Sequence, residues 1–272
     1  MTSIDIHQNV PPNGDSSRKL YPQFILFGDS ITQYSHSDLV PAVSEYYIRR
    51  LDVVNRGFSG YTAPMGLNIL PRFFPTLSSL SPSTDSNSID VAPHVRLMTV
   101  FFGANDACLP GQLQHVPLAR YKQALGEIAN HEVLRLHGTK LIFITPPPVD
   151  EHQLEDGNKC RSAENTALYA AACREVVVSL GLPFVDLWSV FMTRAGWKGP
   201  GSDGKLIGSL ERERSSVLDE LLSDGLHLTS LGYQLLWAEL KALIESELSS
   251  EVPERLPMVY PAWSDVLASQ AK

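Results

Sequence analysis

The most restrictive feature of this 272-residue sequence is a set of short apolar runs that alternate with segments of helical spacing. Each run is rich in Val, Ile, Leu or Phe and has the length of a strand that is buried on both faces of a sheet. The runs span 24–27, 52–55, 95–102, 140–145 and 183–187. Strands that alternate with helices imply right-handed βαβ crossovers. We therefore predict an α/β fold with a central parallel sheet covered by helices on both faces.

The segments between and after these runs have apolar residues at intervals of three and four, which indicates amphipathic helices. In the last third of the chain, we expect Gly225 to stop one helix. Thr229 or Ser230 is expected to cap the next helix, whose leucines form an apolar stripe. The expected helices span 39–51, 65–74, 118–136, 165–180, 210–223 and 229–248.

The strand pattern resumes after every irregular stretch, which predicts one globular domain over residues 21–248. The polar residues 1–20 are expected to form a flexible leader. Two stretches rich in Ser, Pro or acidic residues, 78–90 and 146–160, are expected to be surface insertions. Residues 249–272 include the aromatic side chains of Tyr260 and Trp263, so we expect this tail to pack on the domain or on a partner subunit.

The charge balance narrows the class of partner. With 22 Lys and Arg against 30 Asp and Glu, the formal net charge is −8, which disfavours binding to nucleic acid or to anionic lipid. The sequence shows no secretory signal and no apolar stretch long enough for stable membrane insertion. Its three cysteines cannot all pair, and their low density favours a reducing compartment. We expect a soluble, cytoplasmic protein.

Polar blocks follow the apolar runs at the carboxyl ends of the predicted strands, where chemistry collects in an open α/β sheet. The first three runs lead into Gly-Asp-Ser at 28–30, Asn-Arg-Gly-Phe-Ser-Gly-Tyr-Thr at 55–62 and Gly-Ala-Asn-Asp at 103–106. A fourth block, Asp-Gly-Leu-His at 224–227, follows the last run. Four such blocks at one edge of a sheet predict a single active site.

Three residues of these blocks have the side chains that hydrolysis of an ester requires. Ser30 follows a strand where a helix is expected to begin, so its hydroxyl can be presented above the sheet and its N–H can face an oxyanion. His227 is the candidate base. Asp224, three residues earlier, can accept the Nδ1–H of His227 and fix its tautomer.

Taken together and in this order, the blocks resemble those of the SGNH hydrolases, also called GDSL esterases and lipases. The strings at 27–33, 56–62, 103–108 and 224–227 are similar to those of the fungal isoamyl acetate-hydrolysing esterase branch. The resemblance implies a three-layer α/β/α, flavodoxin-like fold. The main departures are the Ala-Pro-Met that follows Thr62 and the stretch 78–90, which we expect to change the rim of the substrate pocket.

The resemblance also assigns roles to residues. It implies an oxyanion hole made by the N–H groups of Ser30 and Gly60 and by the side-chain amide of Asn105, and it implies a homodimer. The substrate it favours is a small acetate-type ester, cleaved through an acyl-enzyme without a cofactor. The same family includes carbohydrate deacetylases, lysophospholipases and thioesterases, and a fold does not decide between such substrates.

Each block also has an ordinary structural interpretation. The block at 28–30 reads as a turn after a strand, and the block at 55–62 as a loop that its glycines permit. Asn105-Asp106 reads as a helix N-cap followed by a first-turn carboxylate. Asp224 and His227 read as a helix-terminal hydrogen bond and a surface imidazole. Asp29 is interpreted either as a carboxylate that shapes the loop behind Ser30 or as an ordinary turn residue. A non-catalytic binding protein that retains the scaffold is the alternative from another functional class.

Other motifs carry less weight. The Gly-x-Gly-x-x-Gly at 199–204 follows no strand, so we interpret it as a loop. No Gly-x-Ser-x-Gly is present, which disfavours an α/β-hydrolase elbow. No His-Glu-x-x-His is present either, and His131 is expected on a solvated helix face. Cys108 is assigned no role, and we expect no metal site.

Overall fold

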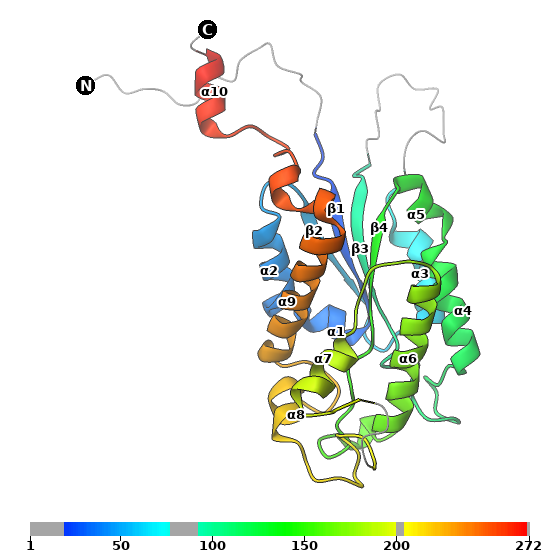
Figure 1. Cartoon of the computed structure of the whole chain (residues 1–272). Coiled ribbons are helices and arrows are strands. Elements are labelled where there is room, and N and C mark those ends of the chain that lie inside the picture. Colours follow the sequence, from blue (N-terminus) through cyan, green and yellow to red (C-terminus); the bar gives the residue numbers. More distant parts are fainter. Residues whose placement is uncertain (1–18, 77–91, 200–203, 271–272) are drawn as a thin grey trace.

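A computed structural model describes residues 19–76, 92–199 and 204–270, and its centre is a five-stranded parallel sheet (Figure 1). The strand order is β2-β1-β3-β4-β5. The strands are β1 (Gln23–Gly28), β2 (Asp52–Gly57), β3 (Val95–Phe101), β4 (Lys140–Ile144) and β5 (Phe184–Val185). The order reverses between β1 and β3, so the crevice at the carboxyl ends of these two strands is the usual place for a ligand.

Helices cover both faces of the sheet, as Figure 1 shows. One face is covered by α2 (Leu39–Tyr46), α7 (Leu187–Arg194) and α9 (Ser230–Glu247), and the other by α3 (Ala63–Phe73), α4 (Leu118–Ala129), α5 (Glu132–His137) and α6 (Ala163–Ser179). The short helix α8 (Ser216–Leu221) packs against α7 and α9, beyond the carboxyl ends of the strands. Two short helices complete the described chain: α1 (Ser30–Gln33) directly follows β1, and α10 (Trp263–Gln270) lies near the C-terminus. The predicted three-layer α/β/α fold is confirmed.

The alternation of side chains along β1 explains why the apolar runs predicted strands buried on both faces. Phe24 and Leu26 point into the cluster shared with α2 and α9, whereas Ile25 and Phe27 point into the cluster shared with α3 and α4. All four side chains are at most 1 % exposed. Successive residues of a strand face opposite sides, so a strand covered twice must be apolar at every position.

Three predicted helices differ from those observed. The helix predicted over 39–51 ends at Tyr46 as α2. The helix predicted over 118–136 is divided into α4 and α5, because the backbone of His131 is extended and its imidazole accepts a hydrogen bond from the N–H of Val133. His131 is thus an N-cap, and its expected place on a solvated helix face was wrong. The helix predicted over 210–223 is shortened to α8, which begins after its N-cap Ser215.

Gly225 does not stop that helix, contrary to the prediction. It has a φ of +80°, and a Cβ atom there would lie 2.4 Å from the carbonyl oxygen of Asp150. Gly225 therefore allows close approach to a buried segment. The prediction for α9 is confirmed, because Thr229 caps it through a hydrogen bond of 3.2 Å from the N–H of Gly232.

The stretch 146–160 is not wholly a surface insertion as predicted. Its first five residues, 146–150, are buried, and Val149 and Asp150 are at most 1 % exposed. The three prolines have no N–H to satisfy, and the N–H of Asp150 donates to the carbonyl oxygen of Gly225 over 2.9 Å. The insertion expected at 78–90 lies outside the described residues, as does most of the loop expected at 199–204.

The C-terminal tail contacts the domain through its first part. Leu256 is 7 % exposed, and Arg50 donates a hydrogen bond of 2.6 Å from Nε to the carbonyl oxygen of Pro253. Arg96 forms an ion pair with Glu251, whose side chain is 4 % exposed. By contrast, Trp263 at the start of α10 is 76 % exposed.

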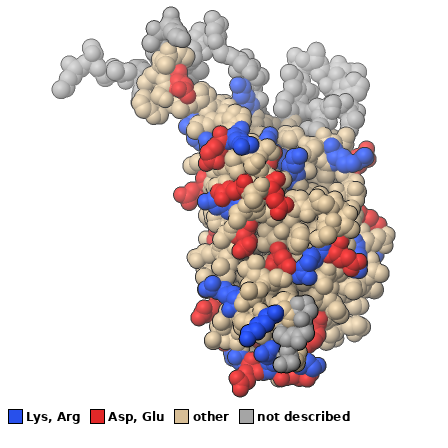
Figure 2. Space-filling model, viewed as in Figure 1, with Lys and Arg blue, Asp and Glu red and all other residues tan. Residues whose placement is uncertain are grey.

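Acidic and basic side chains are interspersed on the face of the molecule drawn in Figure 2, which carries no continuous basic patch among its described residues.

Within the ranges that the structure covers, none of the helices has the length and apolar character needed to span a bilayer.

Candidate active site

The loop after β1 presents Ser30 at the start of α1. Gly28, the last residue of β1, has no room for a side chain, because a Cβ atom would lie 2.5 Å from the carbonyl oxygen of Phe101. Asp29 caps α1 by accepting a hydrogen bond of 2.9 Å from the N–H of Ile31. These contacts fix the backbone on both sides of Ser30, whose residue exposure is 7 %.

The structure brings Ser30, His227 and Asp224 into one chain of hydrogen bonds. Ser30 Oγ lies 2.9 Å from Nε2 of His227, and Nδ1 of His227 lies 2.7 Å from Oδ2 of Asp224. A carboxylate can only accept here, so Nδ1 carries the proton and Nε2 is free to accept the Ser30 hydroxyl. The sequence-predicted residues thus meet in the order that nucleophilic catalysis requires.

Asp224 is held as a carboxylate. Its Oδ1 accepts hydrogen bonds from the N–H of Leu226 (3.0 Å) and from that of His227 (2.8 Å). Burial acts to raise the pKa of Asp224, but the hydrogen bonds and the imidazole of His227 outweigh it and lower the pKa to about 2. Asp224 is therefore ionised at neutral pH and can stabilise an imidazolium at His227.

Tyr34 is a neighbour of the imidazole that the sequence did not indicate. Its ring meets that of His227 edge to face, with ring centroids 5.7 Å apart, and Tyr34 is 47 % exposed. It lies in the helical turn Tyr34–Ser37 directly after α1. The half-exposed ring of Tyr34 therefore packs against the imidazole and is part of the surroundings of the site.

Asn105 lies in the loop after β3 and is 4 % exposed. Its Nδ2 donates to the carbonyl oxygen of Tyr61 over 3.0 Å and, at 3.5 Å, to Oδ2 of Asp29. The second contact is at the limit of a hydrogen bond. Asn105 therefore joins the loop after β3 to the loops after β1 and β2, and one of its amide hydrogens is weakly engaged.

Gly60 lies in the loop after β2 and has a φ of +80°, a conformation that favours glycine. No hydrogen bond joins it directly to Ser30 or Asn105 among the described contacts. Its carbonyl oxygen accepts a hydrogen bond of 2.8 Å from Nε2 of Gln114, which also donates to Oδ1 of Asn105 over 3.2 Å. Gly60 and Asn105 are thus linked through a third side chain.

Two buried carboxyl groups lie behind these loops. Burial raises the pKa of Asp29 to about 7, against the opposing effects of the Ile31 N–H and of the charges of His227 and Arg161. Burial likewise raises the pKa of Asp106 to about 8. Asp106 accepts the N–H of Ala63 at 2.9 Å and 3.2 Å, so it serves the first turn of α3 and not a helix that follows it in sequence.

Arg161 and Gln114 contact Asn105 and were not anticipated from the sequence. Nη2 of Arg161 donates to Oδ1 of Asn105 over 2.9 Å, and Arg161 is 4 % exposed. Arg161 follows the stretch 146–160, which the sequence assigned to the surface. The only available signal was the position of the proline run directly after a predicted strand, at the edge of the sheet where the site was expected.

Cys108 is buried, with its Sγ 3.2 Å from Sγ of Cys160 and both thiols free. Burial raises the pKa of Cys108 to about 12, which makes it a poor nucleophile. Among the described residues, no group of three or more His, Cys, Asp or Glu side chains is arranged to hold a metal ion.

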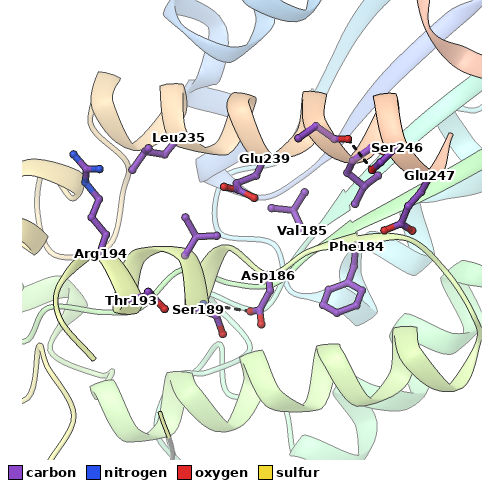
Figure 3. A pocket seen from close by; sticks show the side chains of 13 residues that line it. Phe184, Val185, Asp186, Ser189, Thr193, Arg194, Leu235, Glu239, Ser246 and Glu247 are labelled. Carbon is purple, nitrogen blue, oxygen red and sulfur yellow. Dashed lines mark hydrogen bonds between the residues drawn. The ribbon is translucent and has the colours of Figure 1, made fainter. Parts of the chain in front are cut away.

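A groove of about 790 Å³ lies elsewhere, between α7 and α9 beside β5 (Figure 3). It is lined by Asp186, Ser189 and Arg194 on one side and by Leu235 and Glu239 on the other. None of its lining residues belongs to the Ser30 site, so the chemistry described above does not take place there.

Comparison with known proteins agrees with this geometry. Residues 26–235 match the model of the GDSL-like Lipase/Acylhydrolase family. The human isoamyl acetate-hydrolyzing esterase 1 homolog is 32 % identical over 264 residues, which are 93 % of this chain and 91 % of the human protein. A GDSL esterase/lipase of Arabidopsis thaliana is 33 % identical over 83 % of this chain and 86 % of its own length.

Solved structures share the fold. A lipase/acylhydrolase from Enterococcus faecalis has a TM-score of 0.55 and 25 % identity, with 89 % of this chain and 100 % of that chain covered. An acetylxylan esterase from Geobacillus stearothermophilus has a TM-score of 0.54 over 84 % of this chain and 96 % of that chain, at 16 % identity. The protein is a carboxylic ester hydrolase that belongs to the GDSL-like lipase/acylhydrolase family.

Proposed function

We propose that the protein hydrolyses small, acetate-type carboxylic esters through an acyl-enzyme on Ser30. The observation that carries this proposal is the hydrogen-bond chain from Ser30 Oγ through the imidazole of His227 to the carboxylate of Asp224. The preference for short acyl esters is supported by several relatives named as isoamyl acetate-hydrolyzing esterase 1 homologs, among them the human one.

In the first half of the proposed reaction, Ser30 Oγ attacks the ester carbonyl carbon while Nε2 of His227 takes the hydroxyl proton. Asp224 stabilises the imidazolium that forms. The negative charge on the carbonyl oxygen is accepted by the N–H groups of Ser30 and Gly60 and by Nδ2–H of Asn105. The alkoxide then leaves with the proton from His227, and the acyl group stays on Ser30.

In the second half, His227 takes a proton from water as the water oxygen attacks the acyl carbon. Collapse of the second tetrahedral intermediate returns the proton to Ser30 Oγ and releases the carboxylic acid. No bound cofactor is required, because water is the only co-reactant. Asp29 supports the loop from behind through Ile31 and Asn105 and takes no proton in this cycle.

The test is hydrolysis of a chromogenic short-chain acyl ester by the wild type and by Ser30→Ala. We expect the variant to lose at least about 10³-fold in kcat/KM, which is the scale for a lost nucleophile. Ser37→Ala, at the end of the turn after α1, is the matched control and should retain activity. A Ser30→Ala variant that keeps most of the activity would overturn the assignment.

Substrate class is tested by a panel of alkyl acetates, longer acyl esters, acetylated sugars, thioesters and lysophospholipids. We expect the highest kcat/KM on short alkyl acetates. A preference for acetylated sugars or for long acyl chains would reverse this part of the proposal and leave Ser30 in place. Failure of folded protein to react with a fluorophosphonate probe at Ser30 would instead favour a binding protein.

A further inference from the structure

Arg161 is a buried cation whose described hydrogen bonds all go to neutral acceptors. Its residue exposure is 4 %, and it forms no ion pair within the part of the chain that the structure describes. Burial of a charge is costly unless its hydrogen bonds are satisfied. The position of the guanidinium therefore depends on its neutral acceptors, and these acceptors show which segments of the chain it holds in place.

All five N–H groups of Arg161 have an acceptor. Nε donates to the carbonyl oxygen of Ala104 over 2.9 Å, and Nη1 donates to Oδ1 of Asn158 (3.1 Å) and towards Sγ of Cys160 (3.3 Å). Nη2 donates to Oδ1 of Asn105 over 2.9 Å and to Oε1 of Gln114 over 3.3 Å. The guanidinium thus binds the loop after β3 through the main-chain carbonyl of Ala104 and through the side chain of Asn105.

A guanidinium has donors only, so the group of Asn105 that faces it must be the carbonyl oxygen. The Nδ2 group is therefore turned the other way, towards Tyr61 and Asp29. Donation to Oδ1 by a cation also polarises the amide and strengthens Nδ2–H as a donor. Arg161, together with Gln114, therefore favours this orientation of Asn105 and strengthens its Nδ2–H as a donor.

Gln114 extends this contact to the second loop. Its two Nε2 hydrogens are directed at the carbonyl oxygen of Gly60 (2.8 Å) and at Oδ1 of Asn105 (3.2 Å), while its Oε1 accepts from Arg161. Gly60 and Asn105 follow different strands, β2 and β3. Gln114 therefore helps to set the distance between the two loops, together with the hydrogen bond from Asn105 to Tyr61.

We propose that Arg161 and Gln114 are positioning residues that hold Gly60 and Asn105 as a pair of donors aimed at the reacting carbonyl oxygen. The inference rests on the proposed function, because it assigns those donors to the oxyanion of that reaction. Neither residue transfers a proton or touches the substrate in this scheme. Their effect should appear in the transition state and not in substrate binding.

The first test compares kcat and KM of Arg161→Met and Gln114→Met with the wild type on the same ester. We expect kcat to fall by about 10–100-fold in Arg161→Met and by a similar or smaller factor in Gln114→Met, with KM changed by less than about threefold. Arg161→Lys keeps the positive charge but lacks the planar guanidinium with its five donors, so its kcat should lie between those of Arg161→Met and the wild type. Arg174→Met, which removes the ion pair between this residue of α6 and Asp186 at the start of α7, is the matched control and should keep wild-type kcat.

A double-mutant cycle separates positioning from general damage. If Arg161 acts through Asn105, then Arg161→Met should lower kcat by less than about threefold in an Asn105→Ala background. A full loss in that background, additive to that of Asn105→Ala, would overturn the proposal. So would wild-type kcat in both Arg161→Met and Gln114→Met.

A readout without substrate distinguishes this inference from the proposed function. Hydrogen exchange should accelerate in Gln114→Met in peptides that contain Gly60 and Asn105, and should stay unchanged there in Arg174→Met. If the wild type hydrolysed no ester, the proposed function would fail, and exchange alone would decide on the positioning residues. Unchanged hydrogen exchange in both loops of Gln114→Met would overturn the inference about the positioning residues. This test remains available if Arg161→Met fails to fold, because it needs only Gln114→Met.

Discussion

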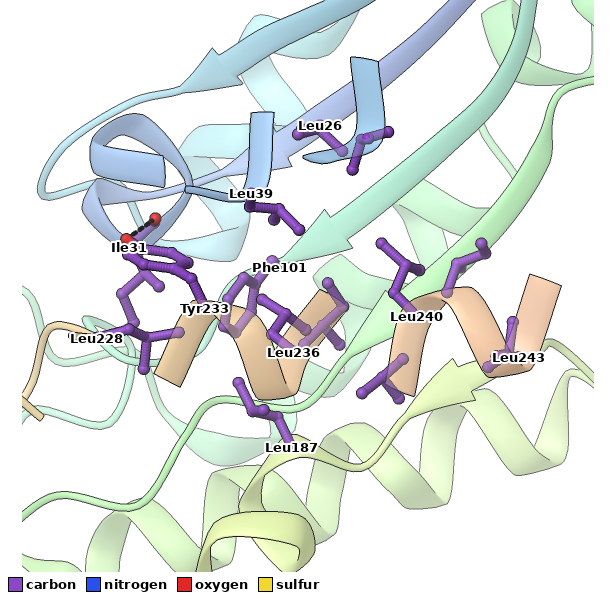
Figure 4. Close-up of a cluster of buried hydrophobic side chains, with 14 of the residues drawn as sticks. Leu26, Ile31, Leu39, Phe101, Leu187, Leu228, Tyr233, Leu236, Leu240 and Leu243 are labelled. Carbon is purple, nitrogen blue, oxygen red and sulfur yellow. Dashed lines mark hydrogen bonds between the residues drawn. The ribbon is translucent and has the colours of Figure 1, made fainter. Parts of the chain in front are cut away.

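The hydroxyl of Tyr233 donates a hydrogen bond of 2.6 Å to the carbonyl oxygen of Ile31, the residue after the proposed nucleophile (Figure 4). Tyr233 lies in the first turn of α9 and is 4 % exposed. The loop that carries His227 leads directly into this helix. The bond therefore joins the segment of the proposed base to the segment of the serine, behind the reacting atoms.

Tyr233→Phe removes this bond and leaves the carbonyl oxygen of Ile31 without its buried donor. We expect a loss of about 1–3 kcal/mol in the free energy of unfolding, measured by urea denaturation. We also expect kcat to decrease, because the distance between Ser30 and His227 is less well fixed. Tyr260→Phe is a control, since that hydroxyl bonds at the surface to Lys19. Equal stability of Tyr233→Phe and the wild type would contradict the prediction.

Asp224→Asn should leave the fold in place and reduce turnover. The amide can donate to Nδ1 of His227 and so favour the tautomer that has its proton on Nε2, where it cannot accept the Ser30 proton. By analogy with such replacements in serine proteases, kcat is expected to fall by about 10²–10⁴-fold. Asp219→Asn, whose partner is Arg214 at the surface, should retain activity. Initial rates on a chromogenic ester measure both variants.

Gly57→Ala should destabilise the protein through a steric clash. A Cβ atom at Gly57 would lie 2.0 Å from the N atom of Gln33 and 2.4 Å from its Cα, both in the backbone of α1. We expect a loss of about 1–3 kcal/mol or more in the free energy of unfolding. Gly126→Ala provides the matched control, because nothing lies within 4 Å of its Cβ and alanine favours the helix α4. That control should be as stable as the wild type or slightly more stable.

The buried carboxyl group of Asp106 should make the stability of the fold depend on pH. Burial raises the pKa of Asp106 from 3.8 to about 8, so the folded protein keeps a proton that the unfolded chain releases between these values. The folded state binds more protons, and the free energy of unfolding must fall as pH rises through this window. Asp106→Asn should show a shallower fall, with part of the slope left by Asp29. Urea denaturation across the window measures this, and equal slopes in both proteins would refute it.

Truncation after Leu248 should lower the melting temperature, because it removes Glu251, Pro253 and the buried Leu256 from their contacts with the domain. A shorter truncation after Ala262 removes α10, whose Trp263 is 76 % exposed, and should change the melting temperature little. Differential scanning fluorimetry compares the two. Measurement of oligomer mass on the same samples tests whether the tail also takes part in the homodimer that we expect.

The sheet could be predicted because its strands are largely apolar, most completely in β1, and this pattern depends only on local sequence. The Ser30 and Asn105 blocks could be found because they directly follow parallel strands, which end at one edge of a sheet. The His227 block lies between α8 and α9, and it could be found from its Asp-x-x-His spacing and its place in the order of the family's blocks. Arg161 and Gln114 could not, because they lie in long connections without periodicity and their importance depends on contacts between segments. The prolines at 146–148 suggested a surface loop, yet this segment is buried. A proline run can be buried because it has no N–H groups and therefore few polar groups that need hydrogen bonds.

The hydrogen bond between Ser30 and His227 joins residues 197 positions apart in the chain. During translation the serine is made early, whereas its base emerges only after the whole sheet has been synthesised. A nascent or prematurely terminated chain therefore carries the serine without a general base and should be inert towards esters. The proposed activity therefore requires the last third of the chain to be made and folded against the serine at its start.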